Sequence, residues 1–296
     1  FKAAQALTFL QEGIIQENTP AFPCYHGFIY GSLKVGCHAH GSPLPLVPAL
    51  ATSCNSYFCW GLFRMFGDRK YGSPQNAITV WKDHMVSQGF GYKLGVDLPS
   101  EGRGLIPNAA FYDKPYKGRW NGLTVISIAI GQGEILATPL QIANLSATIA
   151  NRGHFITPHI VKEIQDNQLD SIYRTPRVPT IDRIHYEEVV KGMRAAVTGG
   201  TCRVAGYMFP EGEICGKTGT AQNRGHDHSA FMGFAPMNNP KIAIAVYVEN
   251  GGFGATYGVP IGTLMIEQYL NGKLSPASEA KAAEFRDRII MYGDEE

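Results

Sequence analysis

The sequence predicts an α+β domain in which helices come first, an antiparallel sheet follows, and a last helix closes the fold. Apolar residues in the first two thirds of the chain recur mostly at helical spacing. The last third changes period: residues 213–223, 229–238 and 241–250 predict three consecutive strands joined by short turns. Residues 257–270 then return to helical spacing. We therefore expect helices on one or both faces of a three-stranded sheet.

The N-terminal part is expected to be helical with one irregular interruption. Residues 1–13 carry apolar side chains at helical spacing and end at Gly13, a residue that commonly stops helices. Residues 18–48 are rich in Pro, Gly, Cys and His and predict a long irregular excursion. A second helix is expected over residues 47–66, with Ser53 near its start.

The middle of the chain alternates further helices with loops. Thr138 and Pro139 provide an N-cap and a first-turn proline. The expected segments are a helix over 81–88, a loop over 89–104, a short strand or buried segment over 123–130, and helices over 138–151 and 186–198.

One domain is expected over residues 1–272. Residues 273–296 form a charged C-terminal tail, with a short helix around 280–290, that we place outside the core. The chain of 296 residues is long enough for a substantial core.

Composition excludes some partners. The net charge is +1 and no block of Lys and Arg stands out, which argues against nucleic acid. The longest apolar runs, 123–130 and 242–248, are far shorter than the ~20 residues that cross a bilayer. No signal peptide is present, but because the chain begins inside a motif, this says nothing about location.

Two short motifs carry the functional prediction. Ser53-Cys54-Asn55 lies far upstream of Lys217-Thr218-Gly219-Thr220, and this order of Ser-x-Asn and Lys-Thr-Gly is that of the penicilloyl-serine transferases. Their third motif, Ser-x-x-Lys, should stand N-terminal to both. Lys2 occupies its last position, so the nucleophilic serine is expected two residues before Phe1, outside the given sequence.

Acyl transfer needs a nucleophile, a base and a proton relay to the leaving group. Positions i and i+3 share a helix face, so a serine three residues before Lys2 would lie beside its amine. That amine, desolvated and near other cations, can lose its proton and act as the base. The Ser53 hydroxyl can pass a proton to the leaving amine, while the Asn55 carboxamide holds the substrate and orients the lysine.

The Lys-Thr-Gly-Thr motif lies on a predicted strand, where side chains alternate between faces. Thr218 and Thr220 are expected to face the cleft and bind a carboxylate, and Lys217 to point behind the strand toward Ser53. Gly219 is expected to leave room where the strand passes the nucleophile's helix. The backbone N–H of Thr220, with that of the missing serine, would form an oxyanion hole.

On these residues the chain resembles the transpeptidase domain of class B penicillin-binding proteins, and most closely their penicillin-binding protein 2 group. Beyond the motifs, four further segments are similar to that family, and the likeness covers nearly all of residues 1–272. These segments are 91–101 (GYKLGVDLPSE), 130–143 (IGQGEILATPLQIA), 216–223 and 231–236.

The resemblance implies a penicillin-binding fold with an antiparallel sheet flanked by helices and an all-helical lobe. It implies a peptidoglycan D,D-transpeptidase of cell-wall elongation that cleaves D-Ala-D-Ala stem peptides, forms 4→3 crosslinks and is acylated by β-lactams. It implies that the chemistry needs no cofactor. It also implies that the partner is a RodA-type membrane glycosyltransferase, together with the elongation machinery. The implied location is the periplasmic face of the inner membrane, anchored by an N-terminal helix absent from this chain. Without its serine, the given stretch cannot itself be acylated.

Two rival functions share the three motifs. β-Lactamases and D,D-carboxypeptidases let water take the acyl group, and a β-lactam sensor is acylated without turning over. Glu101 and Glu134 are the only carboxylates in the family-like segments, and nothing in the sequence marks either as a deacylating base.

A cluster of Cys and His residues suggests a structural metal. Cys24, Cys37, His40 and Cys54 offer S and N donors suited to tetrahedral zinc, with His38 as the alternate ligand. The irregular stretch around them has little core of its own, so a metal would stabilise it. Because Cys54 lies inside Ser-x-Asn, such a metal would also position that motif.

Two alternatives remain open for these cysteines. In an oxidising compartment, Cys24 and Cys37 could form a disulfide that closes a loop. Cys54 and Cys59 could instead be small buried hydrophobic residues on the second helix.

Overall fold

The computed structural model describes residues 1–222 and 225–290. Its main sheet has three antiparallel strands in the order β3 (Cys215–Ala221), β4 (His228–Ala235) and β5 (Ile242–Val248). In this register Lys217 lies opposite Met232, and Thr220 opposite Ser229. The predicted meander is confirmed, although residue 223, included in the first predicted strand, lies outside the described residues.

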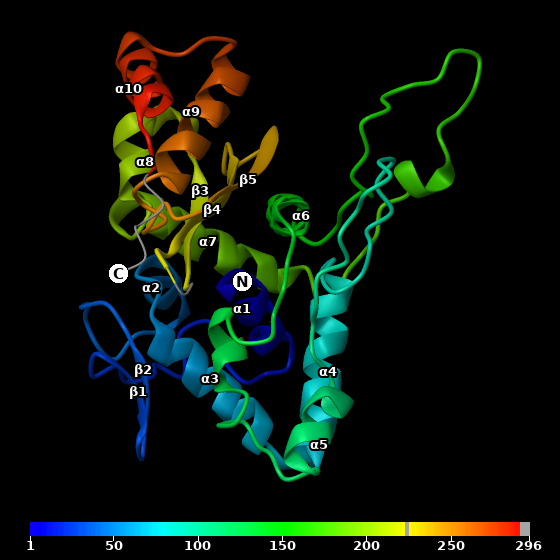
Figure 1. Cartoon of the computed structure of the whole chain (residues 1–296), viewed down its shortest axis with the longest axis vertical. Coiled ribbons are helices and arrows are strands. Elements are labelled where there is room, and N and C mark those ends of the chain that lie inside the picture. The colour runs from blue at the N-terminus through cyan, green and yellow to red at the C-terminus, as the bar shows by residue number, and fades with distance from the viewer. Residues whose placement is uncertain (223–224, 291–296) are drawn as a thin grey trace.

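Helices cover both faces of this sheet (Figure 1). On one face α9 (Gly258–Asn271) packs against β4 and β5, and on the other α6 (Pro139–Ala150) and α7 (Ile184–Gly199) pack against the strands. Each face has its own apolar cluster, because successive strand residues point to opposite sides. The expected α+β layering is therefore confirmed.

The second lobe lies below the sheet in Figure 1 and surrounds α1 (Lys2–Gln11). Residues 3–10 of this helix are all buried, against elements that include α3 (Asn55–Gly67), α4 (Pro74–Ser87) and α7. The central position of α1 puts its first residue, Lys2, between the two lobes.

The remaining elements complete the chain around these. They are β1 (Gly27–Tyr30), β2 (Leu33–Gly36), α2 (Leu46–Ala51), α5 (Ala109–Tyr116), α8 (Arg203–Met208) and α10 (Pro276–Asp287), with 3-10 turns η1 (Arg69–Tyr71), η2 (Ile126–Ile130), η3 (Ser171–Tyr173) and η4 (Pro210–Gly212).

The sequence located most helices, but it missed α5 and α8, placed the start of α4 at residue 81 instead of Pro74, and missed two features near Ser53. The expected helix over 47–66 is two helices, because the chain breaks at Ser53, whose φ of 57° no helix can continue through. The excursion over 18–48 is not wholly irregular, since β1 and β2 pair as a hairpin that packs against α3. The lobe is therefore helical with one hairpin rather than all-helical.

Other segments follow the sequence more closely. Residues 126–130 form the buried 3-10 turn η2 rather than a strand. The helix expected from Thr138 is α6, and its capping box is complete: Thr138 accepts from the Gln141 N–H, and the Gln141 side chain accepts from the Thr138 N–H. The helix expected in the tail is α10, which begins earlier than predicted because Ser275 caps it. Residues 291–296 lie outside the described part.

Two loops run together as an arm that projects from the body (Figure 1). This arm consists of residues 91–104 and 154–180, and hydrogen bonds cross between its two segments. The Asp97 carboxylate accepts from the N–H groups of Ile160 and Val161, and Tyr173 donates to the Gly95 carbonyl. The returning segment of the arm leads into α7.

Candidate active site

The side chain of Lys2 reaches across to the break between α2 and α3. Its Nζ donates to the Ser53 carbonyl at 2.8 Å, the Ser53 hydroxyl at 2.9 Å and Asn55 Oδ1 at 2.5 Å. Burial of the amine, and then the positive charge of Lys217, lower the pKa of Lys2 to about 7. The amine is therefore available both as a proton donor and as a base near neutral pH.

The geometry of Ser53 follows from the helix break. The left-handed backbone at Ser53 ends α2, and Cys54 caps α3 by accepting from the Tyr57 N–H at 3.3 Å. A left-handed non-glycine residue is uncommon and is held here by its surroundings. This turn brings both the carbonyl and the hydroxyl of Ser53 to Lys2.

Asn55 lies at the first turn of α3 and makes three kinds of contact. Its Oδ1 accepts from Lys2, and its Nδ2 donates to the Gly36 carbonyl at 2.7 Å. Its backbone N–H donates to Cys37 Sγ at 3.2 Å. Asn55 thus joins Lys2 to the end of the hairpin and to the segment that follows it.

Lys217 brings a second positive charge to the same place. It is 3 % exposed, and burial lowers its pKa to about 8. Its Nζ donates to the carbonyl of Thr218 at 3.1 Å and lies 3.4 Å from the Thr218 hydroxyl. Among the residues that the structure describes, no hydrogen bond joins Lys217 to Ser53, the neighbour that the sequence analysis expected.

The other motif residues lie along β3 as the strand pattern predicts. Thr218 and Thr220 are half-buried and share a face of the strand. Among the described residues, a Cβ added at Gly219 would meet only Ala230 of β4 within 4 Å. The expected nucleophile is not among these residues, so the role of Gly219 in making room for its helix stays a prediction.

Thr201 is a site residue that the sequence analysis missed. The Thr218 hydroxyl donates to Thr201 Oγ1 at 2.8 Å, from the turn between α7 and α8. The Thr201 N–H donates in turn to the Ala51 carbonyl at the end of α2. No short motif marks this residue, because its role arises only when three distant segments meet.

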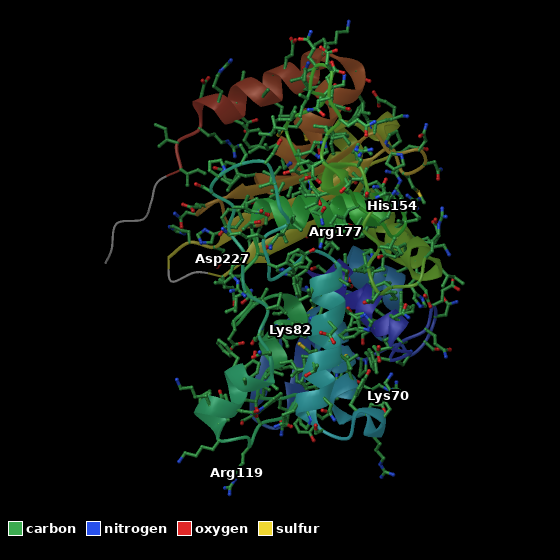
Figure 2. All side chains as sticks on the ribbon, turned by 90° about the vertical axis from the view of Figure 1, so that its right-hand side faces the viewer. Lys70, Lys82, Arg119, His154, Arg177 and Asp227 are labelled. Carbon is green, nitrogen blue, oxygen red and sulfur yellow. The ribbon has the colours of Figure 1, made fainter. Side chains whose placement is uncertain are left out.

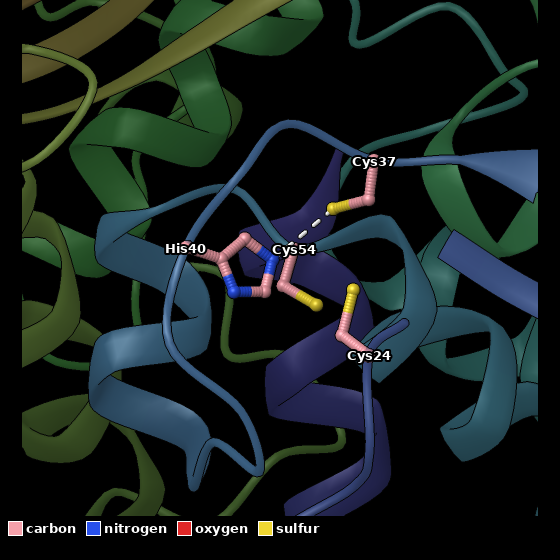
Figure 3. A group of neighbouring side chains, drawn as sticks. All are labelled: Cys24, Cys37, His40 and Cys54. Atoms are coloured by element: carbon pink, nitrogen blue, oxygen red, sulfur yellow. Dashed lines mark hydrogen bonds between the residues drawn. The ribbon is translucent and has the colours of Figure 1, made fainter. Parts of the chain in front are cut away.

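The four predicted metal ligands come together (Figure 3). The ligand atoms of Cys24, Cys37, His40 and Cys54 all lie within 4.8 Å of one another. Cys37 Sγ lies 3.2 Å from His40 Nε2. A tetrahedral zinc with Zn–S bonds of about 2.3 Å would hold its sulfur ligands about 3.8 Å apart, so three thiols and an imidazole at this spacing fit zinc.

The geometry of the six cysteines bears on the two alternatives to a metal site. All six are free thiols, so the Cys24–Cys37 disulfide is not formed in this structure. A hydrogen bond from the Cys54 thiol is the main cause that lowers the pKa of Cys37, to about 4, against the opposing effect of burial. His38, the alternate ligand, instead packs its ring 6.0 Å from that of Phe253, in the loop after β5.

Comparison with known proteins decides the family. The sequence profile of the penicillin binding protein transpeptidase domain matches residues 1–265. The chain belongs to this family. The family assignment and the α+β fold predicted from the motifs are therefore confirmed.

Individual relatives are similar over most of this transpeptidase domain. The peptidoglycan D,D-transpeptidase MrdA of Acinetobacter baumannii is 36 % identical over 228 residues, which are 70 % of this chain and 32 % of that protein. The crystal structure of Pseudomonas aeruginosa PBP2 in complex with WCK 5153 has a TM-score of 0.78 and 31 % identity, covering 93 % of this chain and 59 % of that one. A complex between PBP2 and MreC from Helicobacter pylori has a TM-score of 0.74 and 27 % identity, covering 92 % of this chain and 48 % of that one.

The chain spans about a third of the length of the curated relatives it matches, 32 % and 36 % for the first two. Within the described residues, no helix combines the length and apolar character needed to cross a membrane.

Proposed function

We propose that this domain is a serine-type D-Ala-D-Ala transpeptidase that crosslinks peptidoglycan. The observation that carries the proposal is the position of Lys2 Nζ, within hydrogen-bond distance of Ser53 Oγ and Asn55 Oδ1 and influenced by the charge of Lys217. The nucleophile is a serine two residues before Phe1. On a helix that continues α1 it would lie on the Lys2 face.

Lys2 acts as the base in the first half of the reaction. With a pKa of about 7, a large fraction of Lys2 is neutral at neutral pH and can take the serine proton. The serine oxygen bonds to the carbonyl carbon between the two D-Ala residues, and the backbone N–H groups of Thr220 and the serine stabilise the oxyanion. Lys2 passes this proton through the Ser53 hydroxyl to the departing nitrogen, the C–N bond breaks, and the terminal D-Ala leaves as the amine.

The second half reverses these roles. Lys2 accepts a proton, through Ser53, from the amine of a neighbouring stem peptide as its nitrogen attacks the acyl carbon. The 4→3 amide bond forms, the ester C–O bond to the serine breaks, and Lys2 returns the proton to the serine oxygen. The substrate carboxylate binds along β3, at Thr218, Gly219 and Thr220, with the positive charge of Lys217 nearby. In this structure the Thr218 hydroxyl donates its one proton to Thr201, so it must turn away from Thr201 to donate to the carboxylate.

The contacts of two carboxylates argue against a hydrolase. Glu101 accepts from the N–H groups of Leu94, Gly95 and Val96, and so serves to fold the arm. Glu134 accepts from the Tyr112 hydroxyl at 2.7 Å. Neither carboxylate makes a hydrogen bond to Lys2, Ser53 or Lys217 within the described residues. A water-activating base of the kind a β-lactamase needs is thus not supplied by either.

Partners and location follow from the family as part of the same proposal. The substrates are peptidoglycan stem peptides, and β-lactams acylate the same serine. The elongation partner is a RodA-type membrane glycosyltransferase, at the periplasmic face of the inner membrane. The H. pylori relative is described in complex with MreC, and another similar structure is described as a peptidoglycan synthase complex that coordinates polymerization and crosslinking.

We further propose that Cys24, Cys37, His40 and Cys54 hold a structural zinc. When bound, the metal would cross-link the segments around the hairpin to the start of α3. Asn55 N–H donates to Cys37 Sγ, and Cys54 separates Ser53 from Asn55, so these ligands are tied directly to the Ser-x-Asn motif. The cluster therefore helps to hold Ser53 and Asn55 in place.

Intact-protein mass spectrometry after penicillin treatment tests the activity, on a polypeptide extended upstream through the expected serine. A persistent adduct of one penicillin per chain, lost when that serine is replaced by alanine, is the expected result. Absence of an adduct would overturn the acyl-enzyme mechanism, and rapid release of penicilloic acid would indicate a hydrolase. Crosslinking of a stem-peptide acceptor then separates a transpeptidase from a sensor.

A further inference from the structure

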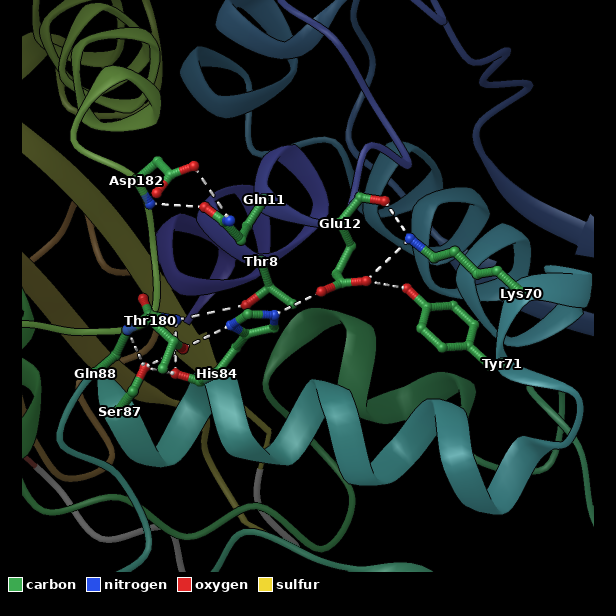
Figure 4. Close-up of polar contacts among 10 residues, drawn as sticks. All are labelled: Thr8, Gln11, Glu12, Lys70, Tyr71, His84, Ser87, Gln88, Thr180 and Asp182. Atoms are coloured by element: carbon green, nitrogen blue, oxygen red, sulfur yellow. Dashed lines mark hydrogen bonds and ion pairs between the residues drawn. The ribbon is translucent and has the colours of Figure 1, made fainter.

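The two ends of α1 carry two very different polar sites, and Figure 4 shows the one at its C-terminal end. Lys2 begins the helix, and Glu12 follows its last residue. Ten helical residues span about 15 Å, so the carboxylate of Glu12 lies well away from the reacting groups. Glu12 is nevertheless the most heavily hydrogen-bonded residue at that end of the helix.

The carboxylate of Glu12 is held by three donors from the segment that leads into and forms α4. His84 Nε2 lies 2.8 Å from Oε1, and the Tyr71 hydroxyl donates to Oε2 at 2.6 Å. Lys70 Nζ lies 2.9 Å from Oε2 and also donates to the Glu12 backbone carbonyl at 2.5 Å. Burial would raise the pKa of Glu12, but these hydrogen bonds outweigh it and lower the pKa to about 2.

Such an anchor matters because of how α1 is packed. Residues 3–10 are buried, and most are apolar or small, including three alanines. Apolar contacts are not directional, so they define the axial position and rotation of a helix less sharply than hydrogen bonds do. Two other buried side chains of α1 also make polar contacts. Gln5 donates to the Ile128 carbonyl and accepts from Trp81 Nε1, and Thr8 accepts a long hydrogen bond of 3.5 Å from Gln88 Nε2.

The same end of α1 is bonded to the segment that returns from the arm. His84 Nδ1 lies 2.8 Å from Thr180 Oγ1, and the Asp182 N–H donates to Gln11 Oε1 at 2.6 Å. In Figure 2 α4 runs up the side of the molecule, with Arg177 of the arm above its C-terminal end. The C-terminal end of α1 is thus fixed against both α4 and the arm.

Lys2, in contrast, has little freedom to move. Its Nζ must meet three acceptors on Ser53 and Asn55 at 2.5–2.9 Å. A misplacement of about 1 Å at a reacting group can reduce a rate 10²-fold. Because a helix transmits a displacement along its axis, a shift at Glu12 would also displace Lys2.

We propose that Glu12, held by Lys70, Tyr71 and His84, is a positioning residue for Lys2 and for the acylation step. Glu12 fixes the axial position and rotation of α1, and so places the lysine amine against Ser53 and Asn55. This inference rests on the proposed function, since it assigns Lys2 the role of base.

The test compares Glu12→Gln with Glu187→Gln in the polypeptide that includes the upstream serine. Glu187 pairs with Arg152 at 3.0 Å and makes no hydrogen bond to the described residues of α1, so Glu187→Gln, at a more exposed carboxylate than Glu12, is the control for loss of an ion-paired charge. The rate constant of acylation at saturating penicillin and the dissociation constant of the initial complex are measured separately. We expect Glu12→Gln to lower the rate constant about tenfold with the dissociation constant unchanged, and Glu187→Gln to change neither.

This readout separates positioning from a merely structural role. Loss of folded protein lowers the amplitude of acylation, whereas a displaced lysine lowers its rate constant. An unchanged rate constant in folded Glu12→Gln protein would overturn the proposal. If that variant does not fold, the test uses Tyr71→Phe, which removes one hydrogen-bond donor and keeps the charge of Glu12. An acylation rate constant equal to that of wild type would then overturn the proposal.

The proposed function is tested by a different outcome of the same experiment. A wild-type protein that forms no adduct would contradict the acyl-enzyme mechanism itself. A wild type that is acylated, with a Glu12→Gln variant acylated at the same rate, would contradict only the role of Glu12.

Discussion

Lys2 and Asn55 are joined by a hydrogen bond of 2.5 Å between Nζ and Oδ1. The carboxamide that accepts it also donates to the Gly36 carbonyl, and the Asn55 N–H donates to Cys37 Sγ. Asn55 therefore connects the proposed base to the cysteine cluster through one residue. This link explains how a metal that takes no part in the chemistry could still affect the rate.

Acylation should depend on pH through Lys2. The base must be neutral, and burial together with the charge of Lys217 lowers its pKa to about 7. The acylation rate constant should therefore rise with pH and reach half its plateau near pH 7, in stopped-flow measurements with a chromogenic cephalosporin. Lys2→Met should lower that constant by at least about 10²-fold, the lower end for loss of a general base. A flat profile between pH 5.5 and 8.5 would count against Lys2 as the base.

Lys217→Gln should move this profile to higher pH. Removing a positive charge close to Lys2 makes the protonated amine less unfavourable, so the pKa of Lys2 rises toward its ordinary value. The same variant should bind the β-lactam carboxylate more weakly. Lys241→Gln, at an exposed lysine that contacts Asn239, is the control and should leave both quantities unchanged. A profile that stays at the wild-type pH would mean that the two lysines are not electrostatically linked.

Thr201→Val should strengthen carboxylate binding more than it changes the chemistry. The variant keeps the shape of the side chain but removes the acceptor of the Thr218 hydroxyl, whose one proton can then go to the carboxylate without breaking that hydrogen bond. One neutral hydrogen bond contributes about 1 kcal/mol, so the dissociation constant of the initial β-lactam complex should fall about fivefold. Thr198→Val provides the control, because its hydroxyl makes only a local 3.4 Å contact with the Ala195 carbonyl. Equal dissociation constants for the two variants would show that Thr201 does not influence binding at the site.

The sequence predicted the two motifs, the meander and the grouping of the four Cys and His side chains because each depends on local pattern or on residue type. It could not predict the break at Ser53, since periodicity continues across residues 52–54 and only the left-handed backbone ends the helix. Nor could it identify Thr201 or Glu12, because their partners are brought to them by the fold.

The metal proposal can be tested with a pair of histidines two residues apart. His40→Ala should lose zinc, lower the melting temperature and slow acylation, because His40 Nε2 lies among the three thiols. His38→Ala should retain the metal, since its ring faces Phe253. Elemental analysis gives the zinc content of each variant, and chelation of the wild type should reproduce the His40→Ala effect. If the purified wild type contains no zinc and its melting temperature does not change with chelator, the metal proposal is wrong and the cysteines are free thiols.

Glu12 should also make the domain sensitive to acid. Its folded-state pKa of about 2 lies below the value of 4.5 for a free glutamate, so its contribution to stability is present above pH 4.5 and is lost as pH falls through 2. A shift of this size would correspond to ~3 kcal/mol, which partial exposure and screening reduce to about 1–2 kcal/mol. Glu12→Gln should lower the free energy of unfolding by that amount at pH 7 and by much less near pH 2, in urea titrations followed by circular dichroism. Glu187→Gln, at a more exposed pair, should lose less than about 1 kcal/mol at either pH. A Glu12→Gln deficit that is the same at pH 7 and pH 2 would show that packing, and not the charge of the carboxylate, secures this end of α1.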